Sequence, residues 1–183
     1  MLQLPASFGP EQLETLGRFI ELLPGELTYA VEVRHLKLFD KGVKEQAFNK
    51  LLINNCINRV IMDTRALFSC PANGDVIIEA AHRKKPRVPT NVIATSNQPV
   101  VRFVGHPVPE ENPGFYKPWI HKAKQWLDEG KKPFLFFHSA NQIDAPWLAE
   151  AFFKDFKAIY PEVSIPDLYL PRRSVDQLDI FGS

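Results

Sequence analysis

Five short segments of this chain have the apolar pattern of β-strands and carry polar or ionisable residues toward their C-terminal ends. They span residues 2–5, 28–35, 59–64, 100–105 and 133–139. Side chains alternate between the two faces of a strand. The alternation therefore predicts one apolar face and one polar face for a sheet built from all five segments.

The predicted apolar face holds Leu2, Leu4, Tyr29, Val31, Val33, Val60, Met62, Val101, Phe103, Leu135 and Phe137. The predicted polar face holds Gln3, Glu32, Arg34, Asp63, Arg102 and His138. In a (β/α) barrel the first set packs against the surrounding helices, and the second lines the mouth, where active sites lie. The sequence thus predicts the place of a site, but no particular reaction.

Helical segments separate the predicted strands. Apolar spacing and helix-boundary residues predict helices over residues 10–23, 42–55 and 117–129, and a fourth that begins at Asp144 and ends before Pro161. Alternating strands and helices indicate βαβ units and a parallel sheet. Five strands are too few for an eight-stranded barrel of about 250 residues. We therefore expect an α/β, TIM-barrel-like domain over residues 1–160 with about five of eight strands, as in the C-terminal part of a barrel, and an extended tail over 161–183.

The segment from residue 65 to residue 99 is far longer than an ordinary loop. It contains a predicted short helix over 75–82 and a basic run with Arg83, Lys84, Lys85 and Arg87. Because the segment follows a strand, it should lie on the catalytic face of a barrel. The basic run then either contacts phosphate groups or forms a solvated surface.

The 183 residues are 45% hydrophobic and 23% charged with a net charge of +1, which is an ordinary globular composition. Overall charge therefore does not by itself predict a nucleic-acid binder, and any basic patch must be local. Cys56 and Cys70 lack metal-type spacing and suit reduced thiols better than a disulfide. No apolar run reaches the ~20 residues of a membrane span, and the N-terminus lacks a signal-peptide pattern, so we expect a cytoplasmic protein without a membrane partner.

Several motifs of the chain occur together in one known family. They are Leu2-Gln3-Leu4-Pro5, Leu22-Leu23-Pro24-Gly25, Tyr29-Ala30-Val31-Glu32-Val33-Arg34-His35, Asn58 to Arg65, Arg83 to Pro89, Val101-Arg102-Phe103-Val104-Gly105 and Ala145-Pro146. Over nearly its whole length the chain resembles the YecE-like family, a bacterial family of unknown function. The resemblance implies a TIM-barrel-like fold with three strands upstream of these five. Val104 stands where many members carry His, which removes one polar group from the expected mouth.

Glu32, Arg34 and His35 form the densest polar cluster on any predicted strand. Glu32 is a candidate general base or metal ligand, Arg34 a phosphate or carboxylate clamp, and His35 an acid or ligand. The alternative is a buried Glu–Arg pair that only tethers strands, because a charge buried alone costs several kcal/mol.

Asp63, Arg102 and His138 each end a predicted strand. Asp63 either binds a divalent metal or caps the turn that follows. Arg102 is expected to meet an anionic ligand or one of the carboxylates, and His138 with Asn141 is a candidate for acid–base chemistry. No HxH or HExxH spacing occurs, so a divalent metal is only one possibility among several. Gln3 is the weakest candidate.

The tail sequence Gln177-Leu178-Asp179-Ile180-Phe181 resembles the peptide by which bacterial replication and repair proteins bind the sliding clamp. Gln177 would supply hydrogen bonds, and Leu178, Ile180 and Phe181 would fill an apolar pocket. The alternative is that these apolar residues pack back on the barrel.

Three functions remain open on these observations. The leading hypothesis is a phosphate-handling TIM-barrel enzyme, linked to nucleic acid and to replication through the tail, with Glu32, Asp63, His138 and His35 in catalytic roles. Its phosphate ligands would be Arg34, Arg102, Lys84, Lys85 and Arg87. The alternatives are a hydrolase or isomerase of a sugar or sugar phosphate, and a catalytically silent binding protein.

Overall fold

A parallel sheet of five strands forms the centre of the structure, and the strands lie in the order in which they occur in the sequence. The computed structural model describes residues 1–170, with β1 (Leu2–Gln3), β2 (Ala30–Glu32), β3 (Asn58–Asp63), β4 (Val100–Val104) and β5 (Phe134–His138). Each crossover returns the chain beside the preceding strand, as in a (β/α) barrel. The predicted α/β, TIM-barrel-like architecture is confirmed. Within residues 1–170 the sheet is open, with β1 and β5 at its edges.

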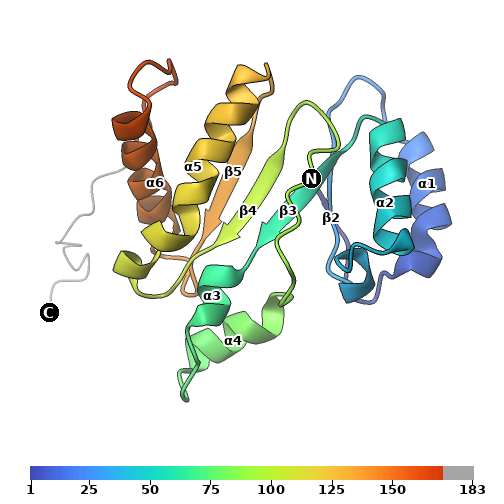
Figure 1. Ribbon diagram of the computed structural model, residues 1–183. Helices are drawn as coiled ribbons and strands as arrows, with labels where there is room; N and C mark the ends of the chain where they lie inside the picture. The colour runs from blue at the N-terminus through green and yellow to red at the C-terminus, as the bar shows by residue number, and fades with distance from the viewer. Residues whose placement is uncertain (171–183) are drawn as a thin grey trace, which may run out of the picture.

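Two pairs of helices flank the sheet (Figure 1). α1 (Leu13–Glu21) and α2 (Val43–Asn54) lie beside β1, β2 and β3, whereas α5 (Pro113–Asp128) and α6 (Ala145–Ile159) lie beside β4 and β5. Three 3₁₀ turns, η1 (Pro10–Gln12), η2 (Leu36–Leu38) and η3 (Pro109–Glu111), complete the connections. Two apolar cores result, one under α1 and α2 around Phe48 and Leu52, the other under α5 and α6 around Trp126 and Phe152.

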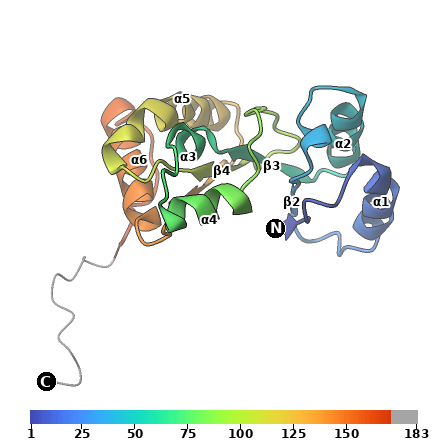
Figure 2. The ribbon, with the colours of Figure 1, turned by 90° about the horizontal axis from the view of Figure 1, so that it is seen from below.

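The long segment after β3 forms two short helices, α3 (Arg65–Ser69) and α4 (Val76–Lys84), at the C-terminal end of the strand (Figures 1 and 2). α4 begins where the sequence predicts, because the Asp75 carboxylate accepts hydrogen bonds from the backbone N–H groups of Ile77 and Ile78 at 2.8 and 3.1 Å. Because α3 and α4 directly follow β3, the segment lies over the edge of the sheet that is formed by the C-terminal ends of the strands.

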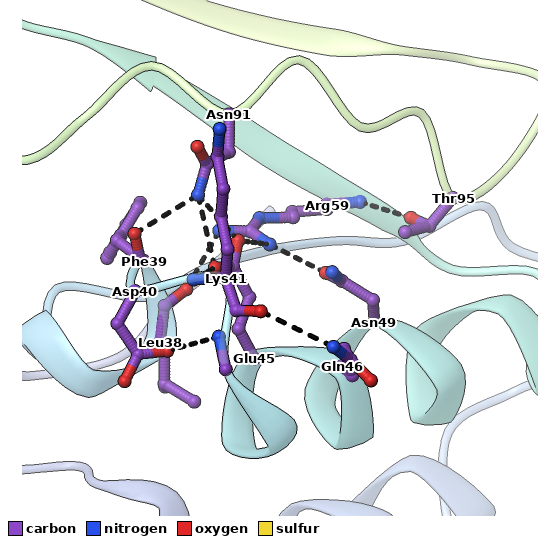
Figure 3. Close-up of polar contacts among 11 residues, drawn as sticks. Leu38, Phe39, Asp40, Lys41, Glu45, Gln46, Asn49, Arg59, Asn91 and Thr95 are labelled. Carbon is purple, nitrogen blue, oxygen red and sulfur yellow. Dashed lines mark hydrogen bonds and ion pairs between the residues drawn. The ribbon is translucent and has the colours of Figure 1, made fainter.

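Residues 91–95, which lead from α4 back toward β4, are attached to the domain by a buried ion pair and its hydrogen bonds (Figure 3). The sequence did not reveal this ion pair. Arg59 Nη1 lies 2.7 Å from Glu45 Oε1, and both side chains are about 1% exposed. Asn91 Nδ2 donates to both oxygens of Glu45, and the hydroxyl of Thr95 accepts from the Arg59 amide at 2.7 Å. These bonds attach residues 91–95 to α2 and β3.

The strand register contradicts the predicted face of one strand. Paired residues of neighbouring parallel strands face the same side of a sheet. Met62 pairs with Arg102, and Asp63 pairs with Phe103. Met62 therefore lies on the interior face with Arg102, and Asp63 faces the helices. All six residues of β3 are buried, and its polar residues Asn58, Arg59 and Asp63 fall on both faces, so no alternation in its sequence assigns a face.

The predicted faces of β4 and β5 are correct. Leu135 pairs with Val101 and Phe137 with Phe103, on the helix side. On the interior face, Ala30, Val60 and Val100 form a small apolar cluster below the polar ends of the strands. Phe134 and Phe136 continue this face on the edge strand β5, where they are 47% and 50% exposed.

Candidate functional site

A large cavity lies at the C-terminal edge of the sheet, and we call it the mouth cavity. Its volume is about 1270 Å³. Its walls come from the strand ends, α4 and the loop after β5, and its lining includes Gln3, Arg34, Val76, Ile77, Ala80, Lys84, Lys85, Arg102, Val104, His138, Ser139 and Asn141. The position is the one at which a (β/α) barrel carries its active site.

Arg102 is the centre of the polar groups in the mouth cavity. Its Nε donates to His138 Nε2 at 3.0 Å, and its Nη1 donates to Gln3 Oε1 at 3.0 Å and to Glu32 Oε2 at 2.5 Å. Residues from β1, β2, β4 and β5 thus meet at one guanidinium group. The structure brings Glu32 and Arg102 together as the sequence predicts.

Glu32 is fully buried and lies between two arginines. Its second oxygen, Oε1, accepts from Arg34 Nε at 3.0 Å. Arg34 also donates through Nη1 to the backbone carbonyl of Lys84 at 3.2 Å, which ties the strand end to α4. Both carboxylate oxygens are therefore occupied, so Glu32 orients the two guanidinium groups rather than standing free as a base.

Positive charge exceeds negative charge in this cluster. Burial, and then the nearby Arg102 and Arg34, lowers the pKa of the Lys85 amine to about 8. Burial, and then Arg102 and Lys85, lowers the pKa of the His138 imidazole to about 4. At neutral pH His138 is uncharged and accepts through Nε2, whereas Arg34, Arg102 and most of Lys85 are positive against the single charge of Glu32.

The guanidinium groups of Arg34 and Arg102 each have one nitrogen that is available to bind a ligand. Within the described part of the chain, Nη2 of Arg34 and Nη2 of Arg102 make no hydrogen bond. Arg34 and Arg102 side chains are 18% and 12% exposed, so these donors belong to a partly desolvated site. Such donors bind anions more strongly than fully hydrated ones do.

Asp63 is not part of this cluster, and its predicted inward position is wrong. Its carboxylate accepts from Arg65 Nε and Nη2, from the Thr90 hydroxyl and from Trp119 Nε1 at 2.7 Å. Burial raises the pKa of the Asp63 carboxyl, but the hydrogen bonds from Arg65 and Trp119 outweigh burial and hold that pKa below its ordinary value. The carboxylate joins the start of α3 to α5.

Two further candidates lie away from the mouth cavity. His35 Nδ1 accepts from the Lys37 amide at 3.3 Å, as an N-cap of η2, and the His35 ring lies beside Gly9. The Arg87 guanidinium stacks over the Phe68 ring at 5.7 Å and does not line the mouth cavity. Of the predicted basic residues, Lys84 and Lys85 line it, together with Arg83.

The sequence did not reveal a second cavity next to the first. It has a volume of about 580 Å³ and is lined by residues of α4, the loop before α5, α5 and α6, among them Ile77, Ile78, His106, Pro107, Pro109, Tyr116, Ser139, Ala140, Asn141, Trp147, Leu148 and Ala151. The only available signals were the apolar start of α4 and the two prolines after β4, which do not by themselves indicate a cavity.

Two findings concern metals and membranes. Among residues 1–170 no group of three or more His, Cys, Asp or Glu side chains is placed to hold a metal ion. In the same range no helix is both long enough and apolar enough to cross a membrane. The tail residues Gln177, Leu178, Ile180 and Phe181 lie outside the described residues.

Comparisons with known proteins agree on one family. Residues 1–172 match the family described as "Protein of unknown function DUF72". The chain is 38% identical over 162 residues to the UPF0759 protein YecE of Escherichia coli K12, and equally to that of E. coli O157:H7, covering 88% of this chain and 59% of each relative. The chain thus spans about three fifths of the length of these curated relatives.

A DUF72 family protein from Enterococcus faecalis V583 has a similar structure. Its crystal structure at 2.52 Å aligns with a TM-score of 0.60 and 18% identity, over 88% of this chain and 60% of that one. A second crystal structure, at 3.10 Å, aligns with a TM-score of 0.56 over 93% of this chain. At this identity the likeness supports the fold.

Proposed function

We propose that this chain, which belongs to the DUF72 family of proteins of unknown function, binds a phosphorylated molecule in its mouth cavity. The observation that carries the proposal is the pair of arginines on one buried carboxylate, with Lys85 beside them. Three cationic groups face one anionic group in a partly enclosed cavity, and an anion would balance the excess charge.

The chemistry of the donors favours a phosphate group over other anions. Arg34 and Arg102 both offer planar guanidinium donors, and Lys85 offers a point charge, which together suit a tetrahedral oxyanion. Glu32 supports this role because it holds both guanidinium groups in place through Oε1 and Oε2. His138 supports it as a neutral acceptor for Arg102.

The same contacts favour binding over acid–base catalysis. Glu32 has both oxygens occupied by arginines, and His138 has its Nε2 occupied by Arg102. A general base needs a free lone pair near the proton it abstracts. In this proposal Glu32 and His138 are positioning residues, and Arg34, Arg102 and Lys85 contact the ligand.

Calorimetric titration with inorganic phosphate tests the proposal. We expect Arg102→Met and Arg34→Met each to weaken phosphate binding about tenfold or more, because a charge-assisted hydrogen bond contributes about 1.5–3 kcal/mol. Arg18→Met is the matched control, since Arg18 is an exposed arginine on α1. Equal phosphate affinity in all four proteins, or no binding to the wild-type protein, would overturn the proposal.

A second proposal rests on the tail sequence alone. We infer from the pattern of Gln177, Leu178, Ile180 and Phe181 that residues 177–181 bind the bacterial sliding clamp. A labelled peptide of these residues should bind the clamp with roughly micromolar affinity, and the Gln177→Ala, Phe181→Ala peptide should not. Equal binding by both peptides, or by neither, removes the link to replication.

A further inference from the structure

The second cavity adjoins the mouth cavity, and the two cavities share lining residues. Ile77 of α4 and the residues Ser139, Ala140 and Asn141 after β5 line both. A ligand that places its phosphate on Arg34 and Arg102 can therefore extend over these shared residues into the second cavity. The two cavities are thus neighbours with two different kinds of surface.

The wall chemistry of the second cavity is unlike that of the mouth cavity. Apolar and aromatic side chains form much of its wall, with Trp147, Leu148 and Tyr116 from α5 and α6 and Ile77 and Ile78 from α4, and polar residues line the rest. Among residues 1–170, no arginine or lysine lines it. Hydroxyl groups of a sugar or polyol that lie against the apolar part of this wall would lose water without a hydrogen-bond partner. A flat apolar ring would gain from burial and from contact with aromatic side chains.

Three carboxylates, those of Asp75, Glu110 and Asp144, also line the second cavity. The Asp75 carboxylate caps α4, and that of Asp144 accepts from Asn141 Nδ2 at 2.8 Å. Their charge disfavours a second anionic group at this end of the ligand. The charge distribution thus assigns the phosphate end to the mouth cavity and an end without negative charge to the second cavity.

We infer that the ligand of this site is a phosphate monoester of an aromatic or heteroaromatic group without negative charge, with the phosphate in the mouth cavity and the ring in the second cavity. The inference rests on the proposed function, since it assumes that the mouth cavity binds phosphate. It adds the class of molecule that carries the phosphate and separates it from sugar phosphates.

Titration calorimetry with three probes tests the inference. They are inorganic phosphate, phenyl phosphate and glycerol 3-phosphate. We expect phenyl phosphate to bind roughly ten- to a hundredfold more tightly than inorganic phosphate, because a ring of this size is buried. Glycerol 3-phosphate should gain little over inorganic phosphate.

Two variants locate the ring. Ala151→Phe should fill the second cavity from α6 and abolish the preference for phenyl phosphate, while inorganic phosphate binds as before. Trp147→Leu, at the first turn of α6, should reduce the preference with the same phosphate affinity. Thermal unfolding of both variants shows whether they fold, and Ala151→Phe adds volume to an existing space rather than removing a packed group.

The outcomes separate this inference from the proposed function. Phosphate binding without tighter binding of phenyl phosphate overturns the inference and leaves the proposed function standing. Tighter binding of glycerol 3-phosphate than of phenyl phosphate overturns it in favour of a sugar phosphate. An unchanged preference for phenyl phosphate in folded Ala151→Phe also overturns it. Absence of binding by all three probes overturns both.

Discussion

The indole Nε1 of Trp119 donates a hydrogen bond of 2.7 Å to Oδ2 of Asp63, on the face of the sheet that packs against the helices. The bond joins β3 to α5 inside the second apolar core. It shows that a carboxylate at the end of a barrel-type strand does not by that position alone belong to the mouth. The role of Asp63 in this structure is to hold elements together.

The contacts of Asp63 predict a loss of stability without a loss of binding. Asp63→Asn replaces an acceptor by a donor opposite Arg65 and Trp119, so we expect the free energy of unfolding in urea to fall by about 1–3 kcal/mol. Phosphate affinity should not change. Asp128→Asn is the control, because Asp128 is 61% exposed in its pair with Lys124. A folded Asp63→Asn protein that no longer binds phosphate would place Asp63 in the site after all.

The buried pair of Arg59 and Glu45 predicts a large effect of removing one charge. Glu45→Gln leaves the Arg59 guanidinium buried without its counter-ion, and we expect a loss of about 3–5 kcal/mol in the free energy of unfolding. Glu150→Gln in the exposed pair with Lys154 should change that free energy by less than about 1 kcal/mol. Similar losses in the two variants would show that Arg59 gains little from Glu45.

His138 predicts a dependence of stability on pH. Its pKa is lowered from 6.5 to about 4 in the folded protein, so between these values the unfolded chain binds a proton that the folded protein does not. Stability should therefore fall as the pH drops from about 6.5 to about 4. The difference in unfolding free energy between the wild-type protein and His138→Gln should change in that window. A difference that is constant with pH would contradict the lowered pKa.

Lys85 predicts a dependence of anion binding on pH. The pKa of its amine is about 8, so it is charged below that pH and neutral above it. Sulfate is a suitable probe because its own charge stays constant, and we expect its affinity to fall as the pH rises through about 8 and above. Lys85→Met should bind sulfate more weakly below that pH and show a flatter profile. Identical profiles for the two proteins would exclude Lys85 from the anion site.

The exposed interior face of β5 predicts self-association of the 183-residue chain. Phe136 lies on an edge strand and is 50% exposed, and an edge with apolar side chains favours pairing with another chain. Phe136→Ser should lower the weight-average molar mass that sedimentation equilibrium measures at a fixed protein concentration. Ile53→Ser is the matched control, since Ile53 is 52% exposed on α2. The same mass for the wild-type protein and Phe136→Ser would refute this.

The sequence predicted the parallel sheet and most of the polar face correctly, for a local reason. Arg102 is the one polar residue of β4 and His138 that of β5, so each strand offers a single polar side chain, and its position assigned both residues to the interior face without knowledge of their partners. β3 instead carries polar residues on both faces, Asn58 on one and Arg59 and Asp63 on the other, and both faces are buried, so there the assignment of Asp63 failed. The ion pair of Arg59 and Glu45 was equally invisible, because its partners lie on different elements.

By itself the sequence determined the alternation of strands and helices, the parallel sheet and the set of polar residues at the strand ends, because these follow from local periodicity. Only the tertiary structure decided which of those residues meet. Arg102 is 70 residues from Glu32 in the chain, yet their side chains are in contact. Such contacts depend on strand register and on the path of residues 65–99, which place α4 over the mouth cavity and fix its excess of positive charge. The strand register and the path of residues 65–99 are set by the packing of the whole domain. A local sequence pattern holds no information about that packing.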